Sequence, residues 1–272
     1  MYSMTLSLGA AALLAVMHGQ AAPAEAARLQ PQTEQAWREY VRSTEARRER
    51  EIAARTASPS VTGARIQIAP MGEGGADGSV DVPSGLIHHW RGRVLVPGVT
   101  LDDLLRYVRL PPKQSDVLAS KILEDRGDRL RLFMKLTRTE LITVTYHTEH
   151  LVEFRRHGPG RASSRSVATK IAELAQANTP QEREKPAGED LGLLWRLQAY
   201  WWYEEVPGGV LVECESLSLS RGIPLLLKPF ASGMVDRVAR ESMTRTLETL
   251  RRQAAAFATP PVARRAEDRN SP

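Results

Sequence analysis

The 272-residue sequence contains a single cysteine, Cys214. One thiol can form neither an intramolecular disulfide nor the multi-cysteine zinc site of a ribbon or finger. The fold must therefore depend on its hydrophobic core, and a core of about 150 residues or more is large enough for that. Cys214 itself is expected to be buried rather than reactive.

The chain has no strong excess of either charge. It carries 37 Lys and Arg against 32 Asp and Glu, and its 42% hydrophobic and 25% charged residues are ordinary for a soluble globular protein. Basic residues lie beside acids, as in residues 45–51 (EARRERE), which favours a mixed, solvated surface. A nucleic-acid interface would gather Arg and Lys on one element with aromatics between them, and no segment does so. The sequence therefore predicts no nucleic-acid partner.

No stretch is long enough to cross a bilayer, which needs about 20 apolar residues. The apolar run at residues 6–17 (LSLGAAALLAVM) fits the apolar region of a secretory signal, although residues 1–4 contain no Lys or Arg. Small-residue cleavage patterns follow at 22–24 and 24–26. The sequence thus predicts a bacterial protein that is exported, periplasmic or secreted, with no stable membrane span after signal removal. An uncleaved N-terminal anchor is the alternative.

Composition divides the chain into five predicted parts: a signal peptide (1–26), an N-terminal helix (27–55), a Gly/Pro-rich linker (56–84), a folded domain (85–256) and a disordered tail (257–272). The N-terminal helix has a narrow apolar stripe and is expected to dock through Trp37 and Tyr40. The linker is expected to hold a short strand near residues 65–68.

Period-two alternation predicts a run of antiparallel strands in the folded domain. A strand at 85–96 leads into a short helix with Thr100 as its N-cap. A final helix over 232–256 presents one apolar stripe. The apolar face of the last strand changes sides at Leu217 and Leu219, which predicts a bulge or a curled strand end. The other predicted strands cover 129–137, 140–148, 151–156, 164–174, 191–204 and 210–220.

A sheet with one apolar face must cover that face, and the final helix is the natural cover. Because one helix is narrower than six or seven strands, the sheet is expected to curl around it and leave a cleft. The element order, carried by residues 85–108, 195–224 and 232–256, resembles the START-like or SRPBCC helix-grip superfamily. The longer segments look like a group of exported bacterial proteins. The resemblance implies an α+β fold in which a curved antiparallel sheet wraps around a long C-terminal helix. It also implies a cavity for an apolar ligand, which some members use for catalysis.

The histidines argue against a metal site. His88 and His89, and likewise His147 and His150, point to opposite faces of a strand, so one ion cannot take both members of a pair. The sequence predicts neither a metal nor a cofactor. A site that draws His88, His147 and Glu149 from separate strands stays open as an alternative.

Two other patterns have a chemical and a structural interpretation. Glu213 and Glu215 share a strand face, as carboxylates that do acid–base work can, but both are predicted to face water beside an arginine. The serines of residues 216–221 (SLSLSR) lie in no GxSxG motif, so a serine hydrolase is disfavoured.

An aromatic cluster at 195–203 is the most informative feature, because ligand cavities are lined by aromatics with few polar groups. Core packing explains the same cluster equally well. The predicted function is non-catalytic binding of a hydrophobic small molecule or lipid between the sheet and the final helix. The predicted ligand-binding residues are Trp195, Leu197, Trp201, Tyr146, Met134, Val212, Val238, Ser242, Met243 and His88. Among them Ser242, Tyr146 or His88 would orient a polar head.

Two other functions remain as alternatives. A cyclase- or hydratase-like enzyme in the same fold would place His88 or Glu213 inside the cavity, within hydrogen-bond distance of one another. An envelope protein-interaction module would have a packed core and an exposed apolar patch, for example where the helix with Trp37 and Tyr40 docks.

Overall fold

A computed structural model describes residues 28–55, 65–72, 78–139, 143–222 and 228–258. For residues 228–239 it describes the helical backbone and not the side chains. The predicted signal peptide and the residues after 258 lie outside the described residues. No helix in the described ranges is both long enough and apolar enough to span a bilayer.

The described chain has an α+β order in which runs of consecutive strands are separated by helices. The elements are α1 (Pro31–Ala54), β1 (Gln67–Pro70), β2 (Ser79–Val82), β3 (Gly85–Pro97), α2 (Leu101–Tyr107), β4 (Val117–Asp125), β5 (Arg129–Thr139), β6 (Thr143–Arg156), β7 (Arg161–Ala175), β8 (Arg183–Glu184), β9 (Arg196–Val206), β10 (Gly209–Arg221) and α3 (Lys228–Ala258).

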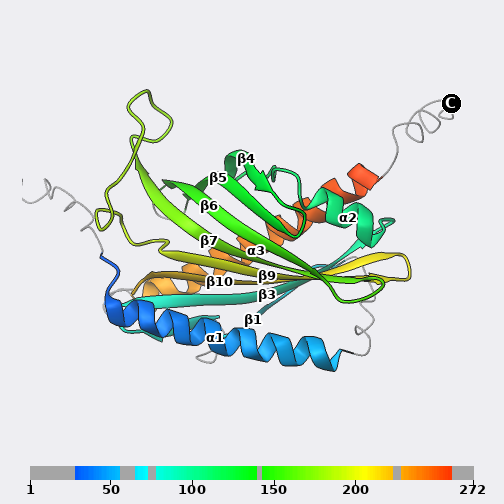
Figure 1. Ribbon diagram of the computed structural model, residues 1–272. Coiled ribbons are helices and arrows are strands. Elements are labelled where there is room, and N and C mark those ends of the chain that lie inside the picture. Colours follow the sequence, from blue (N-terminus) through cyan, green and yellow to red (C-terminus); the bar gives the residue numbers. More distant parts are fainter. Residues whose placement is uncertain (1–27, 56–64, 73–77, 140–142, 223–227, 259–272) are drawn as a thin grey trace, which may run out of the picture.

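One curved antiparallel sheet contains all the described strands. Its main path is β1-β3-β10-β9-β7-β6-β5-β4, while β2 pairs with β3 and β8 with β7. The first long strand, β3, therefore lies beside the last one, β10, and their register is unbroken from Gly85 opposite Arg221 to Pro97 opposite Gly209. Figure 1 shows these two strands side by side near the middle of the molecule, with the β7–β4 half curling above them.

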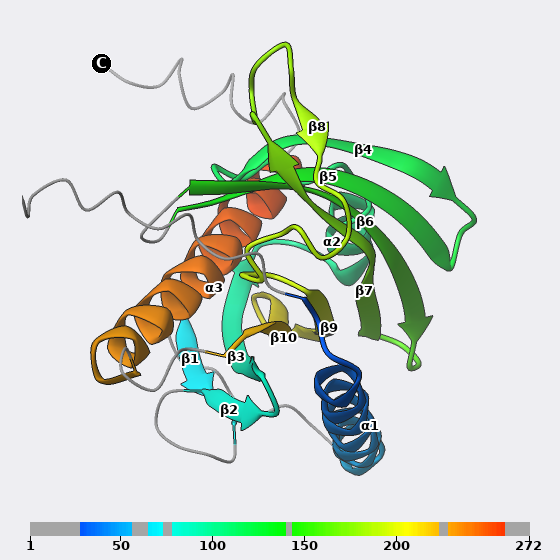
Figure 2. The ribbon, with the colours of Figure 1, turned by 90° about the vertical axis from the view of Figure 1, so that its left-hand side faces the viewer.

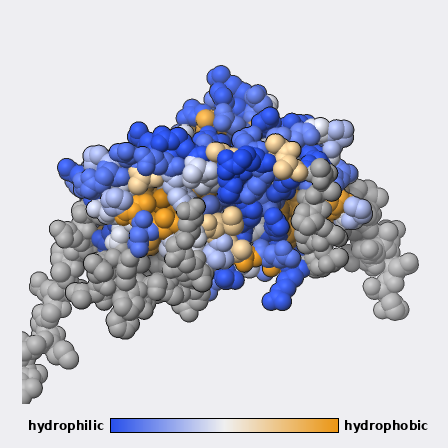
Figure 3. All heavy atoms as spheres, turned by 90° about the horizontal axis from the view of Figure 1, so that it is seen from below, coloured by the Kyte–Doolittle hydropathy of each residue, from blue (hydrophilic) through white to orange (hydrophobic). Residues whose placement is uncertain are grey.

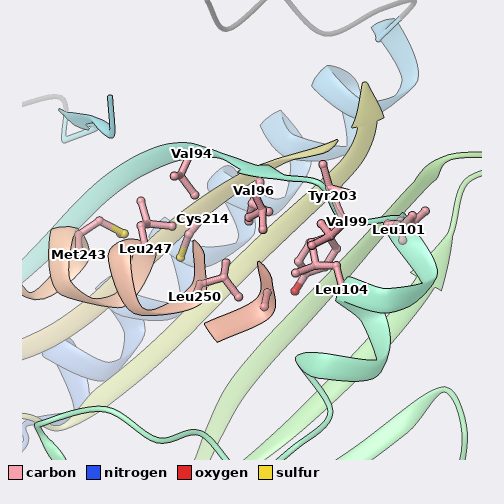
Figure 4. Packing of buried hydrophobic residues seen from close by; sticks show 14 of the residues in the cluster. Val94, Val96, Val99, Leu101, Leu104, Tyr203, Cys214, Met243, Leu247 and Leu250 are labelled. Carbon is pink, nitrogen blue, oxygen red and sulfur yellow. The ribbon is translucent and has the colours of Figure 1, made fainter. Parts of the chain in front are cut away.

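Helix α3 lies on the concave face of this sheet. A helix with its side chains is about 10 Å across, and neighbouring strands are about 4.8 Å apart, so α3 covers about two strands. Its main contact is with β3. Met243, Leu247 and Leu250 point toward Val94, Cys214 and their neighbours in one buried cluster (Figure 4). The remaining strands bend over the helix (Figure 2), which confirms the predicted helix-grip fold.

At Gly92 on β3, side chains of α3 approach the sheet closely. A Cβ atom at this position would lie 2.6 Å from Leu247 Cδ1 and 2.9 Å from Met243 Cγ. A side chain there would have to displace these side chains of α3 or the helix itself, so the glycine lets the side chains of α3 pack directly on β3.

Helix α1 covers the opposite, convex face of the same strands. Trp37 and Val41 of α1 are buried against Leu217 and Leu219 of β10. The bulge predicted at these leucines is wrong, because β10 pairs with both β3 and β9 without a register shift. The alternation of β10 never changes. On the face that α1 covers, Leu217 and Leu219 are apolar and Glu213 and Glu215 are charged, and all four are buried. Both faces of the strand are therefore buried.

Three other segments differ from the prediction. Strand β1 lies where a short strand was predicted near residues 65–68, whereas β2 lies in the segment predicted as a linker; both extend the sheet by pairing with β3. Residues 151–156 continue β6 instead of forming a separate strand. Strand β4 was not predicted; it is the edge strand, with register shifts against β5 at 117–119 and 122–124 that interrupt its alternation.

We expect Gly92→Val to destabilise the fold by about 1–3 kcal/mol, because overpacking where α3 meets β3 forces Leu247 and Met243 out of their positions. The measurement is the free energy of unfolding in urea. Ala119→Val on the exposed edge strand is the control and is expected to change that free energy by less than about 0.5 kcal/mol. Equal effects of the two substitutions would contradict the close packing of α3 on β3.

Candidate ligand cavity

A cavity of about 900 Å³ lies where α3 leaves the concave face of the sheet uncovered. Strands β5, β6, β7, β9, β10 and β3 form its floor, and α3 together with the segment from α2 to β4 closes it from the other side. Its existence follows from the width of one helix, which cannot cover a sheet of this size.

One half of the cavity is apolar. Leu132, Met134 and Leu136 alternate along β5 with their side chains inward, and Val144 and Tyr146 do the same on β6. Both strands show this as a period of two in the sequence, since their intervening residues face outward. These side chains form the apolar lining of the cavity that faces the C-terminal half of α3.

The other half of the floor carries hydroxyl groups. Ser216 and Ser218 of β10 and Ser166 of β7 line the cavity, with Ala199 of β9 between Ser216 and Ser166 in the strand pairing. His150 of β6 lies beside this group, its Nδ1 3.4 Å from Ser166 Oγ. We call Ser166, Ser216, Ser218 and His150 the serine shelf.

Charged groups line the cavity mainly at the end near α2. Arg138 at the end of β5 forms an ion pair with Asp116, which is buried. Leu110 and Phe257 line the same end with exposed fractions of 46% and 43%, and Phe257 packs against Tyr107 with ring centroids 5.9 Å apart. Lys113, which is exposed, also lines the cavity from the segment between α2 and β4. This end therefore has apolar side chains and one lysine at its surface and a neutralised ion pair within.

Most residues predicted to bind a ligand line this cavity: Leu197, Trp201, Tyr146, Met134, Ser242, Met243 and His88. Whether they contact a ligand stays a prediction. Val212 lies instead inside the core cluster under α3, because it is opposite Val94 on β3 where the helix is closest. The side chain of Val238 lies outside the described residues.

Trp195 is placed away from the cavity, in contrast to the prediction. It precedes β9, so the alternation of the strand does not extend to it. Its indole Nε1 donates to Asp190 at 3.0 Å, and its ring packs in the cluster of Trp37 under α1. The serine shelf was missed as a ligand-facing surface. The signal was present in the alternating serines of β10, which had been considered only as nucleophiles.

The carboxylates of Glu213 and Glu215 lie on the convex face and are buried, which corrects the prediction that both face water. Glu215 accepts hydrogen bonds from His89 Nε2 at 2.6 Å and from Arg48 Nη1 at 2.6 Å, and it also pairs with Arg47 and Arg91.

Glu213 is bonded in the same way, by Arg55 at 3.0 Å and Arg93 at 2.6 Å. Arg55 directly follows α1 and Arg93 lies on β3, so this carboxylate also joins the helix to the sheet.

This ion cluster fixes α1 to the sheet. Burial alone would raise the pKa of Glu215, but the hydrogen bond from His89 and the charges of Arg48 and Arg91 hold that pKa well below its ordinary value. Glu213 also has a lowered pKa, because Arg91, Arg55 and Arg93 outweigh its burial. Both carboxylates are thus ionised and fully occupied by cations, and neither is available as a general acid.

The enzyme alternative required His88 or Glu213 inside the cavity and in contact. His88 lines the cavity, whereas Glu213 alternates to the convex face beneath α1. The two side chains therefore lie on opposite sides of the sheet. Among the described residues, no group of three or more His, Cys, Asp or Glu is arranged to hold a metal ion.

The surface on the α1 side is mainly hydrophilic, as seen from below in Figure 3. The exposed flank of α1 carries pairs such as Arg38 with Glu34 and Arg42 with Glu39. Trp37 is buried against this chain's own sheet, so the apolar patch expected for an interaction module at this helix is covered.

No protein-family model matches the chain, and no curated protein sequence matches it either. Solved structures are similar in fold at low identity. A STAR-related lipid transfer protein from Xanthomonas axonopodis is 16% identical, with 70% of this chain and 98% of that chain covered and a TM-score of 0.45. A protein from Thermus thermophilus is 14% identical, with 62% and 98% covered and a TM-score of 0.42.

The Zhui aromatase/cyclase from a Streptomyces species is 11% identical, with 62% of this chain and 93% of that chain covered and a TM-score of 0.37. The similar structures thus include both lipid transfer proteins and an aromatase/cyclase. The likeness concerns the fold alone, and the helix-grip fold of this chain rests on its own strand order and on the packing of α3.

We expect Glu215→Gln to destabilise the protein by about 3–5 kcal/mol, because removing one partner leaves buried arginines uncompensated. A depressed carboxylate pKa stabilises the fold above the ordinary value of 4.5, and this contribution is lost as the pH falls below that value. The free energy of unfolding of the wild type should therefore decrease below about pH 4.5. The variant should show a shallower decrease.

The control is Glu153→Gln, whose carboxylate makes an ion pair at the surface. Its unfolding free energy is expected to stay within about 0.5 kcal/mol of the wild type. Urea titrations at a series of pH values measure both. A steep acid transition that persists unchanged in Glu215→Gln would show that the ion cluster does not fix α1.

Proposed function

We propose that the protein binds a hydrophobic small molecule or lipid in the cavity between the sheet and α3, without catalysing a reaction. The observation that carries this proposal is the cavity itself, about 900 Å³ in volume and walled by Leu132, Met134, Leu136 and Tyr146. Ligand sites in proteins are commonly concave, mostly apolar and about 300–1,000 Å³ in volume. Burial of apolar surface, worth about 25 cal/mol per Å² before association costs, would supply most of the affinity.

The distribution of charge supports binding rather than catalysis. The strongest acid–base candidates in the sequence, Glu213 and Glu215, are bound to arginines on the far side of the sheet. Within the cavity, Asp116 is paired with Arg138. Burial lowers the pKa of His150 to about 4, so that imidazole is neutral near pH 7.

We also propose that the protein is exported. Support comes from the apolar run at residues 6–17 and from the small-residue patterns at 22–24 and 24–26. Export also suits a chain whose one cysteine is buried, since burial raises the pKa of Cys214 and keeps the reactive thiolate scarce.

We expect the wild type to bind the apolar fluorophore N-phenyl-1-naphthylamine saturably and Ala199→Trp to bind it about tenfold more weakly. Ala199 lies on the cavity floor, so a Trp side chain there would occupy space that the fluorophore needs, and a tenfold loss of affinity corresponds to about 1.4 kcal/mol. The control is Thr169→Trp at an exposed position of β7, which should bind like the wild type. Mass spectrometry of organic extracts of protein purified from its native envelope then identifies the cargo.

A wild type that neither binds the fluorophore nor carries stoichiometric lipid would disprove the carrier proposal. A protein partner that co-purifies in the absence of lipid would instead favour the interaction module.

We expect the mature protein to begin after Ala24 or Ala26, because both follow a small-residue cleavage pattern. N-terminal sequencing of the protein recovered from the bacterial envelope or medium measures this. Recovery of the intact N-terminus in a membrane fraction would favour the uncleaved anchor instead.

A further inference from the structure

We infer that the serine shelf is a binding subsite for a neutral, hydroxyl-bearing group of the ligand, whose apolar part then lies along β5 and β6. This inference rests on the proposed function, since it names the chemical class of the ligand that the cavity takes. It is carried by the placement of hydroxyls and charges within the cavity.

The first step is the geometry of the shelf. Ser216 and Ser218 are two residues apart on β10, so both side chains point to the concave face. Ser216 is opposite Ala199, and Ala199 is opposite Ser166, so the two hydroxyls lie about 10 Å apart across two strand spacings. The single methyl group of Ala199 leaves open space between them, and a bound group there meets hydroxyls from both sides.

The second step is that two of these hydroxyls are available. Within the described part of the chain, the hydroxyls of Ser216 and Ser218 make no hydrogen bond to protein, and both side chains are half-buried in the cavity wall. Each can donate one hydrogen bond and accept others. An alkyl chain laid on them would remove their water without replacing its hydrogen bonds, which is unfavourable.

The third step fixes the state of His150. The Thr148 hydroxyl donates to the carbonyl oxygen of Met134 at 3.2 Å, so it accepts from His150 Nε2 at 3.1 Å. These partners assign the proton to Nε2 and leave the Nδ1 lone pair facing Ser166. His150 is 4% exposed and uncharged near pH 7, because its burial disfavours the imidazolium form. It therefore accepts a hydrogen bond from Ser166 and brings no charge to the shelf.

The charges that line the cavity disfavour a charged head at the shelf. Arg138 and Asp116 neutralise each other at the other end of the cavity. Arg138 pairs with Val144 on β6, six residues from His150, which is about 20 Å along the strand. Among the described residues that line the cavity, the other charged side chain is Lys113, which lies in the segment between α2 and β4. An ionised group on the shelf would thus be buried with none of these described charges on the shelf itself, at a high desolvation cost. A neutral group that carries hydroxyls can hydrogen-bond to the serines without that cost.

The test compares three probes with the same ten-carbon chain: monodecanoylglycerol, methyl decanoate and decanoate. Trp90 and Trp201 line the cavity, so the intrinsic tryptophan fluorescence of the full chain reports binding. We expect monodecanoylglycerol to bind most tightly. Ser216→Ala/Ser218→Ala should weaken its binding about tenfold, the effect of two lost neutral hydrogen bonds, and should leave methyl decanoate within about twofold.

Ser163→Ala is the matched control. Ser163 lies on β7 with its hydroxyl bonded to His157, outside the cavity lining, and its loss should leave all three affinities unchanged. Ser218→Thr keeps the hydroxyl and should retain monodecanoylglycerol binding, which separates the hydroxyl from a packing effect.

Two outcomes overturn the inference while the carrier function stands: decanoate binds most tightly, or the double alanine variant weakens all probes equally. If none of the probes binds and N-phenyl-1-naphthylamine does not bind either, the proposed function fails, and the inference falls with it.

Discussion

The architecture depends on a mismatch of width between α3 and the sheet. The helix covers about two strands, whereas the main path of the sheet runs through eight strands from β1 to β4. The apolar stripe of α3 packs on β3 and β10, where Gly92 leaves room for the side chains of the helix. The other strands must bend over the helix to hide their own apolar side chains. They cannot reach it with side chains of ordinary size, and the unfilled space between them is the cavity.

The strand pair β3–β10 is covered on both faces, by α3 on one side and by α1 on the other. Toward α3 it presents Val94, Val96 and Cys214, and toward α1 it presents the carboxylates that bind the arginines of that helix. A buried ion cluster stabilises a fold little more than a hydrophobic contact of the same size would. The ion cluster fixes the position of α1 much more strictly than a hydrophobic contact would, because a displaced α1 would leave several charges unpaired. The leucines of β10 attract α1 to the sheet, and the ions determine where along the strand it rests.

The sequence predicts the elements well because their periodicity is local. The final helix, the short helix after Thr100 and the strands around the 158–160 turn are found where alternation and capping placed them. The bulge in β10 was predicted wrongly, because one face of the strand was assumed to be exposed to solvent, whereas both faces are buried. The partners of Glu215 could not be predicted either, because Arg48 is 167 residues away in the sequence. Trp195 was assigned to the cavity by extending an alternation beyond the strand that carries it.

Fold stability and the candidate site are linked through the alternation of β10. Glu213, Glu215 and Leu217 face α1, while Cys214, Ser216 and Ser218 face the core and the cavity. A slip of one residue in the pairing with β3 would send every one of these side chains to the wrong side. Such a slip would turn carboxylates toward the concave face and bury hydroxyls under α1, and it would also separate the carboxylates from Arg93 and Arg91 on the neighbouring strand. The ion cluster thus penalises this slip heavily. By holding the register of β10, the convex face of the sheet determines which chemical groups the cavity on the concave face presents.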